Sequence, residues 1–398
     1  MTRRSRTTST TIFALLAATA AGCTGSSGPT AATNSAPSVT LVGFDGFEAP
    51  PRPLEDYDKP LVRSTLRESA LEVLEAAAFS ESSLLRANAI ESLQVVPNRV
   101  DAVARAGLTD TNPGVRFASL MTIGKLRLQS SRQFLRPLLS DTDPHVRMAA
   151  IYALTRFGET VDQTPLANNL LTGDSPVRAQ AAYILGEIGN PSAVPMLRDT
   201  AAPPQRLEGS DGRPLEKPAR RIDETLFRLQ TAEALMKLGD DRVRHVIHSA
   251  LYPAVRDDLE AAVLAAQILG ELRDETAIRQ LVELIEQPAA DSPQTSDPRE
   301  RVFLQPIELR LAAATAVAKM GDTGGVYVAD SALSSPDPAV RAQACFLYAA
   351  AAEVRDRGSA GQAALRLDLA KLETLLSDPN PLVRVSAAAG LLRALERG

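Results

Sequence analysis

The feature that most constrains this chain is a spacing of apolar and small residues that recurs nine times along it. In the copy that begins at Val146, such residues follow 4, 7, 8 and 11 positions later, at Ala150, Ala153, Leu154 and Phe157. These positions share one face of an α-helix, because a helix turns once every 3.6 residues. The spacing therefore predicts nine helices of one kind, and the copies begin at Leu85, Val115, Val146, Val177, Phe227, Ala261, Leu309, Val340 and Val383.

Two positions sharpen this register. The residue four positions after each start is small, which lets neighbouring helices approach closely. The residue directly after the start is arginine in eight of the nine copies, and Ala262 is the exception. The eight arginines are Arg86, Arg116, Arg147, Arg178, Arg228, Arg310, Arg341 and Arg384.

Helix start and stop signals agree with the register. Five copies are preceded by a capping residue and a proline, which suits the first turn of a helix; the pairs are Asn112-Pro113, Asp143-Pro144, Ser175-Pro176, Asp337-Pro338 and Asn380-Pro381. Glycines that can end a helix follow four copies, at Gly158, Gly189, Gly239 and Gly321. A second apolar run comes next, so each unit is expected to be a helical hairpin. Residues 53–81 are expected to form an N-terminal capping helix.

The units resemble bacterial HEAT repeats, including the short type found in phycobilin lyases, most clearly at residues 143–158 and 175–190. The resemblance covers residues 82–398 and implies an all-α fold, a right-handed α-solenoid of about nine HEAT-like hairpins. In such proteins the repeated arginine typically forms a structural ladder with acidic groups and carbonyls. The alternative is that the arginines form a binding stripe. Candidate acidic partners are Asp143, Asp240, Asp322, Asp337 and Asp378.

The N-terminus has the organisation of an export signal. Residues 1–22 carry three arginines, then an apolar run too short to span a bilayer. The run ends at Ala20-Ala21-Gly22-Cys23, which resembles the lipobox of bacterial lipoproteins and implies that Cys23 is lipidated. Residues 23–52 are expected to be a flexible tether, because their Gly, Ser, Thr, Ala and Pro cannot bury enough surface to fold. The expected location is the cell envelope, on the periplasmic side of a membrane, with the outer membrane favoured in a two-membrane cell. An ordinary secretory signal and an uncleaved anchor are the alternatives.

Composition argues against nucleic-acid binding. Without the three arginines of residues 1–22, 40 basic residues stand against 48 acidic ones, a net charge near −8. Nucleic-acid binders need a basic surface for the phosphates, and single-strand binders also use aromatic stacking. This chain is only 4% aromatic and has no tryptophan. Its second cysteine, Cys345, falls mid-helix in the register and is expected to be a small buried side chain.

Two connections are too long for the repeat period, at residues 202–223 and 287–305. Both should leave the solenoid on the same edge, either as a partner site or as tolerated insertions. The adjacent basic pair Arg220 and Arg221 makes the first insertion a candidate partner-binding element. A further loop is expected at residues 358–364.

The sequence holds little that could support catalysis. His245 and His248 can share one helix face, but a metal site usually needs three or four ligands. HEAT-fold metal hydroxylases carry His-Glu pairs, and this chain has none. Nucleophile-elbow, Walker A and dinucleotide-binding motifs are absent as well. We therefore expect no enzyme, metal or cofactor. The alternative is an enzyme or enzyme accessory of the phycobilin-lyase type, which rests on fold analogy.

These observations predict a non-catalytic interaction module or scaffold that binds a protein or peptide and meets the membrane only through its lipid. The partner and the oligomeric state are left open. The second helix of each hairpin is expected to line a concave binding surface. The candidate contact residues are Gln133, Arg136, His245, His248, Arg279, Gln280 and Glu283.

Overall fold

The computed structural model describes residues 52–201, 218–252, 259–287, 306–355 and 358–396. Within these segments the regular elements are α-helices and short 3-10 helices, without a β-strand. This confirms the predicted all-α class. None of the helices in the described segments is long and apolar enough to cross a membrane.

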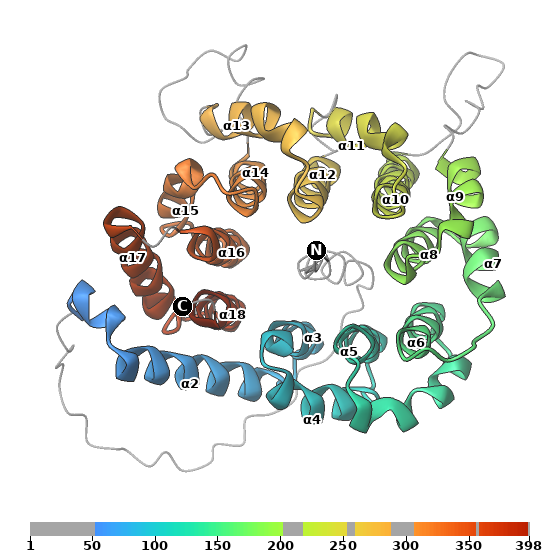
Figure 1. Cartoon of the computed structure of the whole chain (residues 1–398), viewed down its shortest axis with the longest axis horizontal. Helices are drawn as coiled ribbons and strands as arrows, with labels where there is room; N and C mark the ends of the chain where they lie inside the picture. The colour runs from blue at the N-terminus through green and yellow to red at the C-terminus, as the bar shows by residue number, and fades with distance from the viewer. Residues whose placement is uncertain (1–51, 202–217, 253–258, 288–305, 356–357, 397–398) are drawn as a thin grey trace, which may run out of the picture.

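The helices form two concentric layers of a ring (Figure 1). The first helix of each hairpin lies on the inside: α3 (Ser83–Ser92), α5 (Pro113–Leu126), α6 (Pro144–Arg156), α8 (Ser175–Ile188), α10 (Pro218–Lys237), α12 (Leu259–Leu272), α14 (Ile307–Lys319), α16 (Pro338–Val354) and α18 (Pro381–Glu396). The outer layer contains α2 (Pro60–Ala77), α4 (Pro97–Gly107), α7 (Thr164–Thr172), α9 (Val194–Ala201), α11 (Arg244–Ala250), α13 (Ile278–Glu286), α15 (Tyr327–Ala332) and α17 (Ser359–Leu375). These helices follow the nine predicted copies, so the solenoid prediction is confirmed.

The two ends of the described chain meet and close the ring. The outer helix α2 packs on both the first inner helix, α3, and the last one, α18. The 3-10 helix η1 (Leu54–Asp58) packs on α17. Within η1, the Tyr57 hydroxyl donates a 2.5 Å hydrogen bond to Glu373 of α17. The segment predicted to cap the first repeat therefore also covers the last one.

Small residues hold the inner helices close together. A side chain added at Gly186 of α8 would lie 2.8 Å from the Cα atom of Ala234 of α10. Gly270 of α12 approaches Ala316 of α14 in the same way, also at 2.8 Å. Such contacts are needed because the inner layer has the smaller circumference, so its helices must pack with less side-chain volume between them.

Most of the predicted helix boundaries are confirmed. Asn112, Asp143 and Asp337 cap their helices through hydrogen bonds from the following backbone amides. The predicted cap Ser175 is wrong by one residue, because Asp174 is the N-cap and accepts from the Val177 amide. The four predicted terminal glycines all have positive φ, which a glycine adopts without strain: Gly158, Gly189, Gly239 and Gly321.

Two predicted loops are partly wrong. Residues 218–223 belong to α10, whose Pro218 suits the first position of a helix, and residues 359–364 belong to α17. Alanines support α17 there, and its Gly361 is buried. Most of the two long connections, residues 202–217 and 288–305, lies outside the described residues. The outer segment after α5 is not an α-helix but two 3-10 helices, η3 (Gln129–Phe134) and η4 (Arg136–Ser140), with Pro137 near their junction.

Candidate functional site

The repeated arginines contact the turns that join successive hairpins. The Arg116 guanidinium donates two hydrogen bonds to the Asp141 carboxylate, at 2.7 and 2.8 Å. It also donates to the Asp110 carbonyl at 2.8 Å. Because Arg147 in turn donates to the Asp141 carbonyl at 2.7 Å, each acidic turn residue links the arginine before it to the arginine after it.

This ladder recurs in other repeats. The Arg86 guanidinium likewise donates two hydrogen bonds to the Asp110 carboxylate, and the Arg341 guanidinium donates two to the Asp378 carboxylate. The hydrogen bond from Arg86 holds the pKa of Asp110 below its usual value. Other arginines of the series use different partners: Arg178 pairs with Glu224, Arg310 donates to the Ile285 carbonyl, and Arg384 donates to the Asp378 carbonyl. Arg228 is the exception, since its Nε has no hydrogen-bond partner.

The acidic partners differ from those predicted, except for Asp378. Asp143 and Asp337 accept hydrogen bonds from backbone amides at the starts of α6 and α16. Asp240 pairs with Arg198 and Arg242, and Asp322 accepts from the Gly324 amide. The ladder instead uses Asp110 and Asp141, which stand two positions before the capping residues. At that position the carboxylate can reach the arginine of the preceding repeat.

The inner layer presents polar side chains toward the ring interior. We number each copy of the register from its first residue as position 0, so that the repeated arginine stands at position 1. Neighbouring inner helices touch through position 9 of one helix and position 7 of the next, as Gly186 and Ala234 do. Residues at positions 3, 6 and 10 lie between these contact lines, on the side facing the interior. Seven of the nine copies carry a charge at position 10: Lys125, Arg156, Glu187, Lys237, Glu271, Lys319 and Arg393.

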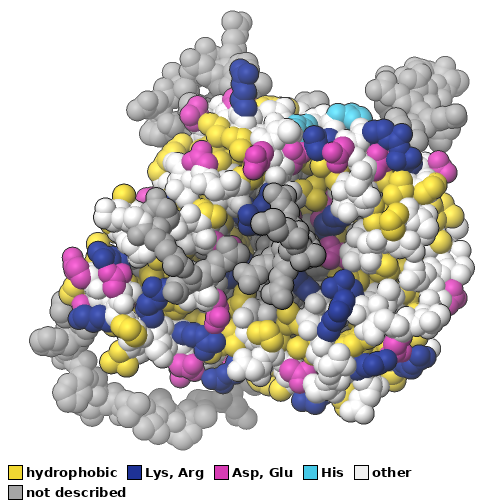
Figure 2. Space-filling view, in the orientation of Figure 1, with side chains coloured by type: hydrophobic (Ala, Val, Ile, Leu, Met, Phe, Trp, Pro, Cys, Tyr) yellow, Lys and Arg dark blue, Asp and Glu magenta, His cyan; other side chains and the backbone are white. Residues whose placement is uncertain are grey.

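Ion pairs join these charges between neighbouring helices. Lys237 of α10 lies 2.6 Å from both Glu187 of α8 and Glu233 of its own helix. Lys319 of α14 lies 2.5 Å from Glu271 of α12. Figure 2 shows acidic and basic side chains interspersed among the described residues on one face of the ring. This mixed surface suits a polar partner better than a polyanion.

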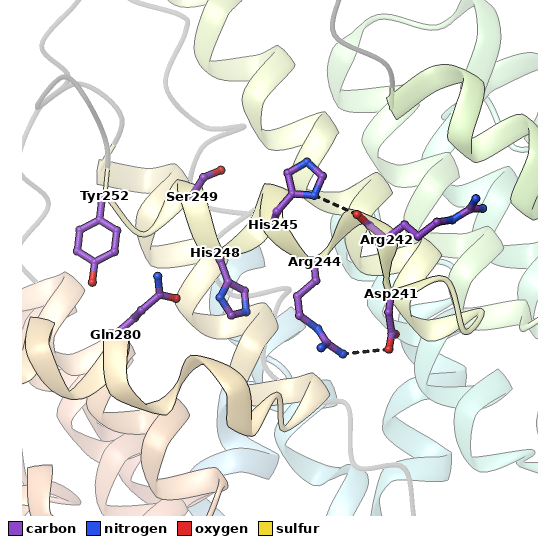
Figure 3. Close-up of a pocket in the computed structure, with 8 residues that line it drawn as sticks. All are labelled: Asp241, Arg242, Arg244, His245, His248, Ser249, Tyr252 and Gln280. Carbon is purple, nitrogen blue, oxygen red and sulfur yellow. Dashed lines mark hydrogen bonds and ion pairs between the residues drawn. The ribbon is translucent and has the colours of Figure 1, made fainter.

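A shallow groove of about 590 Å³ lies on the outer layer between α11 and α13 (Figure 3). His245, His248, Tyr252 and Gln280 contribute to its lining. The His248 ring and the Arg244 guanidinium both approach the buried Asp274 carboxylate, at 3.3 and 3.1 Å. His245 instead turns away and contacts the Arg242 carbonyl at 3.0 Å. The described residues contain no group of three or more His, Cys, Asp or Glu that could hold a metal.

A second groove, of about 450 Å³, lies beside η3 and η4. Gln133 and Arg136 line it, together with Glu159, to which Arg136 donates at 2.8 Å. The structure thus brings five of the seven candidate contact residues into two outer grooves on separate parts of the ring, whereas Arg279 and Glu283 of α13 are not among the lining residues of either groove. Their expected place on the concave surface was wrong, because the second helices form the outer layer (Figure 1). The first helices line the interior, since they carry the small residues that tight packing requires.

The remaining sequence candidates fall elsewhere. Arg220 and Arg221 lie in the first turn of α10 rather than in a loop, and Cys345 is fully buried in α16. Burial raises the pKa of the Cys345 thiol far above its usual value. Cys23 and the predicted signal and tether lie outside the described residues. The inner-face charges were missed, although their recurrence at position 10 is readable in the sequence.

The fold and the repeated contacts define an α-solenoid of HEAT-like repeats, and comparison with known proteins agrees. Residues 102–183 match HEAT repeats, and residues 177–201 match the PBS lyase HEAT-like repeat. The resemblance predicted from the sequence is thereby confirmed. No curated protein matches the chain.

Solved structures of similar arrangement include the CpcE–CpcF complex of phycocyanin lyase from Nostoc sp. PCC7120. It is 19% identical with a TM-score of 0.32, over 73% of this chain and 93% of that one. Human deoxyhypusine hydroxylase is 15% identical with a TM-score of 0.32, over 84% of this chain and 99% of that one. The karyopherin Kap121p is 15% identical with a TM-score of 0.30, over 84% of this chain and 38% of that one. At these values the likenesses do not extend to activity.

Proposed function

We propose that this chain is a non-catalytic protein-interaction module, a scaffold of the bacterial cell envelope anchored through a lipidated Cys23. The proposal rests on two sets of polar residues in the inner helices, one that binds the helices to each other and one that faces the ring interior. Most of the repeated arginines are engaged in the internal ladder. The charged and amide groups at positions 3, 6 and 10 instead face the ring interior, where a partner can meet them.

Site-specific photocrosslinking tests this function. A photoreactive phenylalanine analogue replaces Gln267, at position 6 of the inner helix α12, and in a matched protein it replaces the exposed Glu286 of the outer helix α13. The expected result, in the native membrane, is one reproducible protein adduct from position 267 that position 286 does not give. Equal adducts from both positions, or none from position 267, would contradict an inner-face interaction module.

A phycobilin-lyase-type enzyme or accessory is the second candidate, favoured by the match of residues 177–201 to the PBS lyase HEAT-like repeat. The match identifies a type of repeat, and fold alone does not set activity. An absorption spectrum of protein purified from its own cells separates the two candidates. A bound bilin chromophore would favour the enzyme, and its absence alongside a crosslinked partner would favour the scaffold.

The anchor has its own test. Cys23→Ser removes the atom that would carry the lipid, so the variant is expected to leave the membrane fraction for the soluble envelope fraction. Fractionation after export measures this. Unchanged membrane association in the variant would contradict lipidation at Cys23.

A further inference from the structure

The groove beside η3 and η4, called the η3–η4 groove from here on, lies where the outer layer departs from the repeat pattern. The outer elements of the other described hairpins are α-helices, whereas two short 3-10 helices follow α5. A local break in an otherwise consistent pattern marks a place where function can override regularity. Glu159 is partly buried in this groove, and the other lining residues are exposed, so that a partner can reach them: Gln129, Ser130, Arg132, Gln133 and Arg136.

Two guanidinium groups share one carboxylate in this groove. Arg132 Nε donates to Glu159 Oε1 at 2.9 Å, and Arg136 Nη2 donates to Oε2 at 2.8 Å. The two arginine side chains are 47% and 67% exposed, and in the described part of the chain neither has a second carboxylate at ion-pair distance. Each arginine uses one nitrogen for Glu159, so the other N–H groups of both guanidiniums remain for a ligand.

Other acids near the groove have partners of their own. Asp101 of α4 accepts hydrogen bonds from two serine hydroxyls of η3, and Asp162 accepts from a backbone amide. The charged residues that line the groove itself are the two arginines and Glu159. The lining therefore carries two positive charges and one negative charge.

The groove between α11 and α13 contains a similar cluster with its charges paired. Two residues four positions apart, Arg244 and His248, approach Asp274 there, as the two arginines approach Glu159. Asp274 and Glu159 both stand at position 13 of their copies of the register. Arg244, however, also pairs with Asp241 at 3.0 Å (Figure 3). Among its described lining residues the η3–η4 groove has no counterpart of Asp241, so its arginines can accept one more acid.

Glu159 indicates which ligand the two arginines suit. Guanidinium groups bind planar carboxylates through parallel N–H donors, so a second carboxylate can join the one already present. The amide of Gln133, between the two arginines in the sequence, lines the same groove. A glutamine amide has donors and an acceptor, which complement a main-chain peptide group. An acidic side chain on a peptide supplies both the carboxylate and the peptide group.

We propose that the η3–η4 groove binds an acidic segment of a partner protein, with an aspartate or glutamate side chain on Arg132 and Arg136 and a main-chain peptide group on Gln133. The contact goes beyond the proposed function, because it lies on the outer layer and not in the ring interior. Inorganic phosphate could meet the arginines but has no peptide group for the amide, so the two sources of negative charge can be told apart.

The test uses the full chain and two rhodamine-labelled pentapeptides, one of three glycines and two glutamates and one with glutamines in place of the glutamates. Fluorescence anisotropy should show saturable binding of the acidic peptide alone. Arg136→Gln should raise its Kd about threefold to fivefold, the effect of losing an exposed ion pair. The control Arg242→Gln makes the same charge change on a side chain that is 68% exposed in the other groove, and should change the Kd less than about 1.5-fold.

A third variant should change affinity in the opposite direction. Glu159→Gln removes the internal carboxylate that competes for both arginines, so the acidic peptide should bind about threefold more tightly. A purely structural role of the cluster gives no such gain. An unchanged or higher Kd in Glu159→Gln would overturn the proposal, as would equal effects of Arg136→Gln and Arg242→Gln.

The peptide contact is tested separately. Gln133→Ala should raise the Kd of the acidic peptide about threefold and leave competition by inorganic phosphate unchanged. Equal binding of the acidic and glutamine peptides would overturn the proposal. Displacement of the labelled peptide by phosphate at lower concentrations than by unlabelled acidic peptide would identify a site for a free anion and overturn it too. Failure here leaves the crosslinking result at position 267, and with it the proposed function, unaffected.

Discussion

Arg67 of α2 and Glu396 of α18 form an ion pair, with 3.0 Å between Nη2 and Oε1, although they are 329 positions apart in the sequence. Two further contacts join the same ends, Arg52 to Glu373 at 3.0 Å and Arg366 to Asp58. The ends of the repeat array are therefore held together by polar contacts in addition to the packing of α2 against α18.

The closure contact can be weakened without touching the repeats. Glu373→Ala removes the acceptor of both Arg52 and Tyr57, and should lower the free energy of unfolding by about 1–2 kcal/mol. Amide hydrogen exchange should become faster in α2 and α18 and stay unchanged in α8. Glu283→Ala, on the exposed surface of α13, is the control. If amide exchange in α8 became faster by as much as exchange in α2 and α18, the result would contradict a polar closure contact at this junction.

The arginines of the ladder should contribute most to folding stability where they pair with a carboxylate. Arg116→Ala leaves the largely buried Asp141 carboxylate unpaired and should cost about 3 kcal/mol of stability. Arg147→Ala, which loses only contacts to two carbonyls, should lower Tm by less, with a cost of about 1 kcal/mol. Arg136→Ala, in an exposed pair, should stay within about 0.5 kcal/mol. An unchanged Tm for Arg147→Ala together with lost partner binding would instead support a binding stripe.

Two nearby aspartates should differ in their contribution to stability. Asp141 pairs with Arg116, whereas Asp143 caps α6. Asp143→Ala should cost about 1 kcal/mol, as for other helix caps, and Asp141→Ala about 3 kcal/mol. Chemical denaturation measures both. A double-mutant cycle should find coupling of Arg116 with Asp141 and none with Asp143, and the reverse order of costs would contradict the ladder.

Glu91 of α3 should make stability depend on pH. Burial raises its pKa to about 8, although Lys125 and Arg393 oppose the shift. The folded protein therefore holds a proton that the unfolded chain releases near pH 4.3, roughly the ordinary value for glutamate. The stability that this bound proton contributes to the folded protein is fully present below that pH and is lost as the pH rises toward 8. Tm measured from pH 4.5 to 8 should fall less steeply in Glu91→Gln than in the parent, and identical slopes would contradict the shift.

Local signals in the sequence predicted the hairpins well. The turn before Val146 contains Asp143 and Pro144, and both occupy the expected first-turn positions. Such signals are local because a repeat contacts mainly its neighbours. The choice of ladder acid was missed, because Asp141 and Asp143 are both plausible turn residues in the sequence. Only the position of the preceding arginine in space distinguishes them.

The ring was not predictable in the same way. The pairing of Arg67 with Glu396 leaves no periodic trace, because it occurs once and joins residues from opposite ends. We also expected the wrong helix of each hairpin to face inward. Both helices of a hairpin carry an apolar face that contributes to the core, so the apolar pattern does not tell the inner helix from the outer one. The packing of Gly186 against Ala234 resolves this choice, because it shows which helices are crowded together. The contact that Arg132 and Arg136 share with Glu159 could be recognised only once these residues were placed in space.

Closure also restricts how such a protein can change over evolutionary time. An open repeat array tolerates the duplication or deletion of a unit, because a new end forms as readily as the old one. Here α2 must meet α18, so the bends contributed by successive hairpins must add up to one full turn. Gain or loss of a single hairpin would separate the two surfaces that now cover each other. The number of repeats should therefore be conserved among relatives that share this junction, while the insertions between hairpins can vary freely in length.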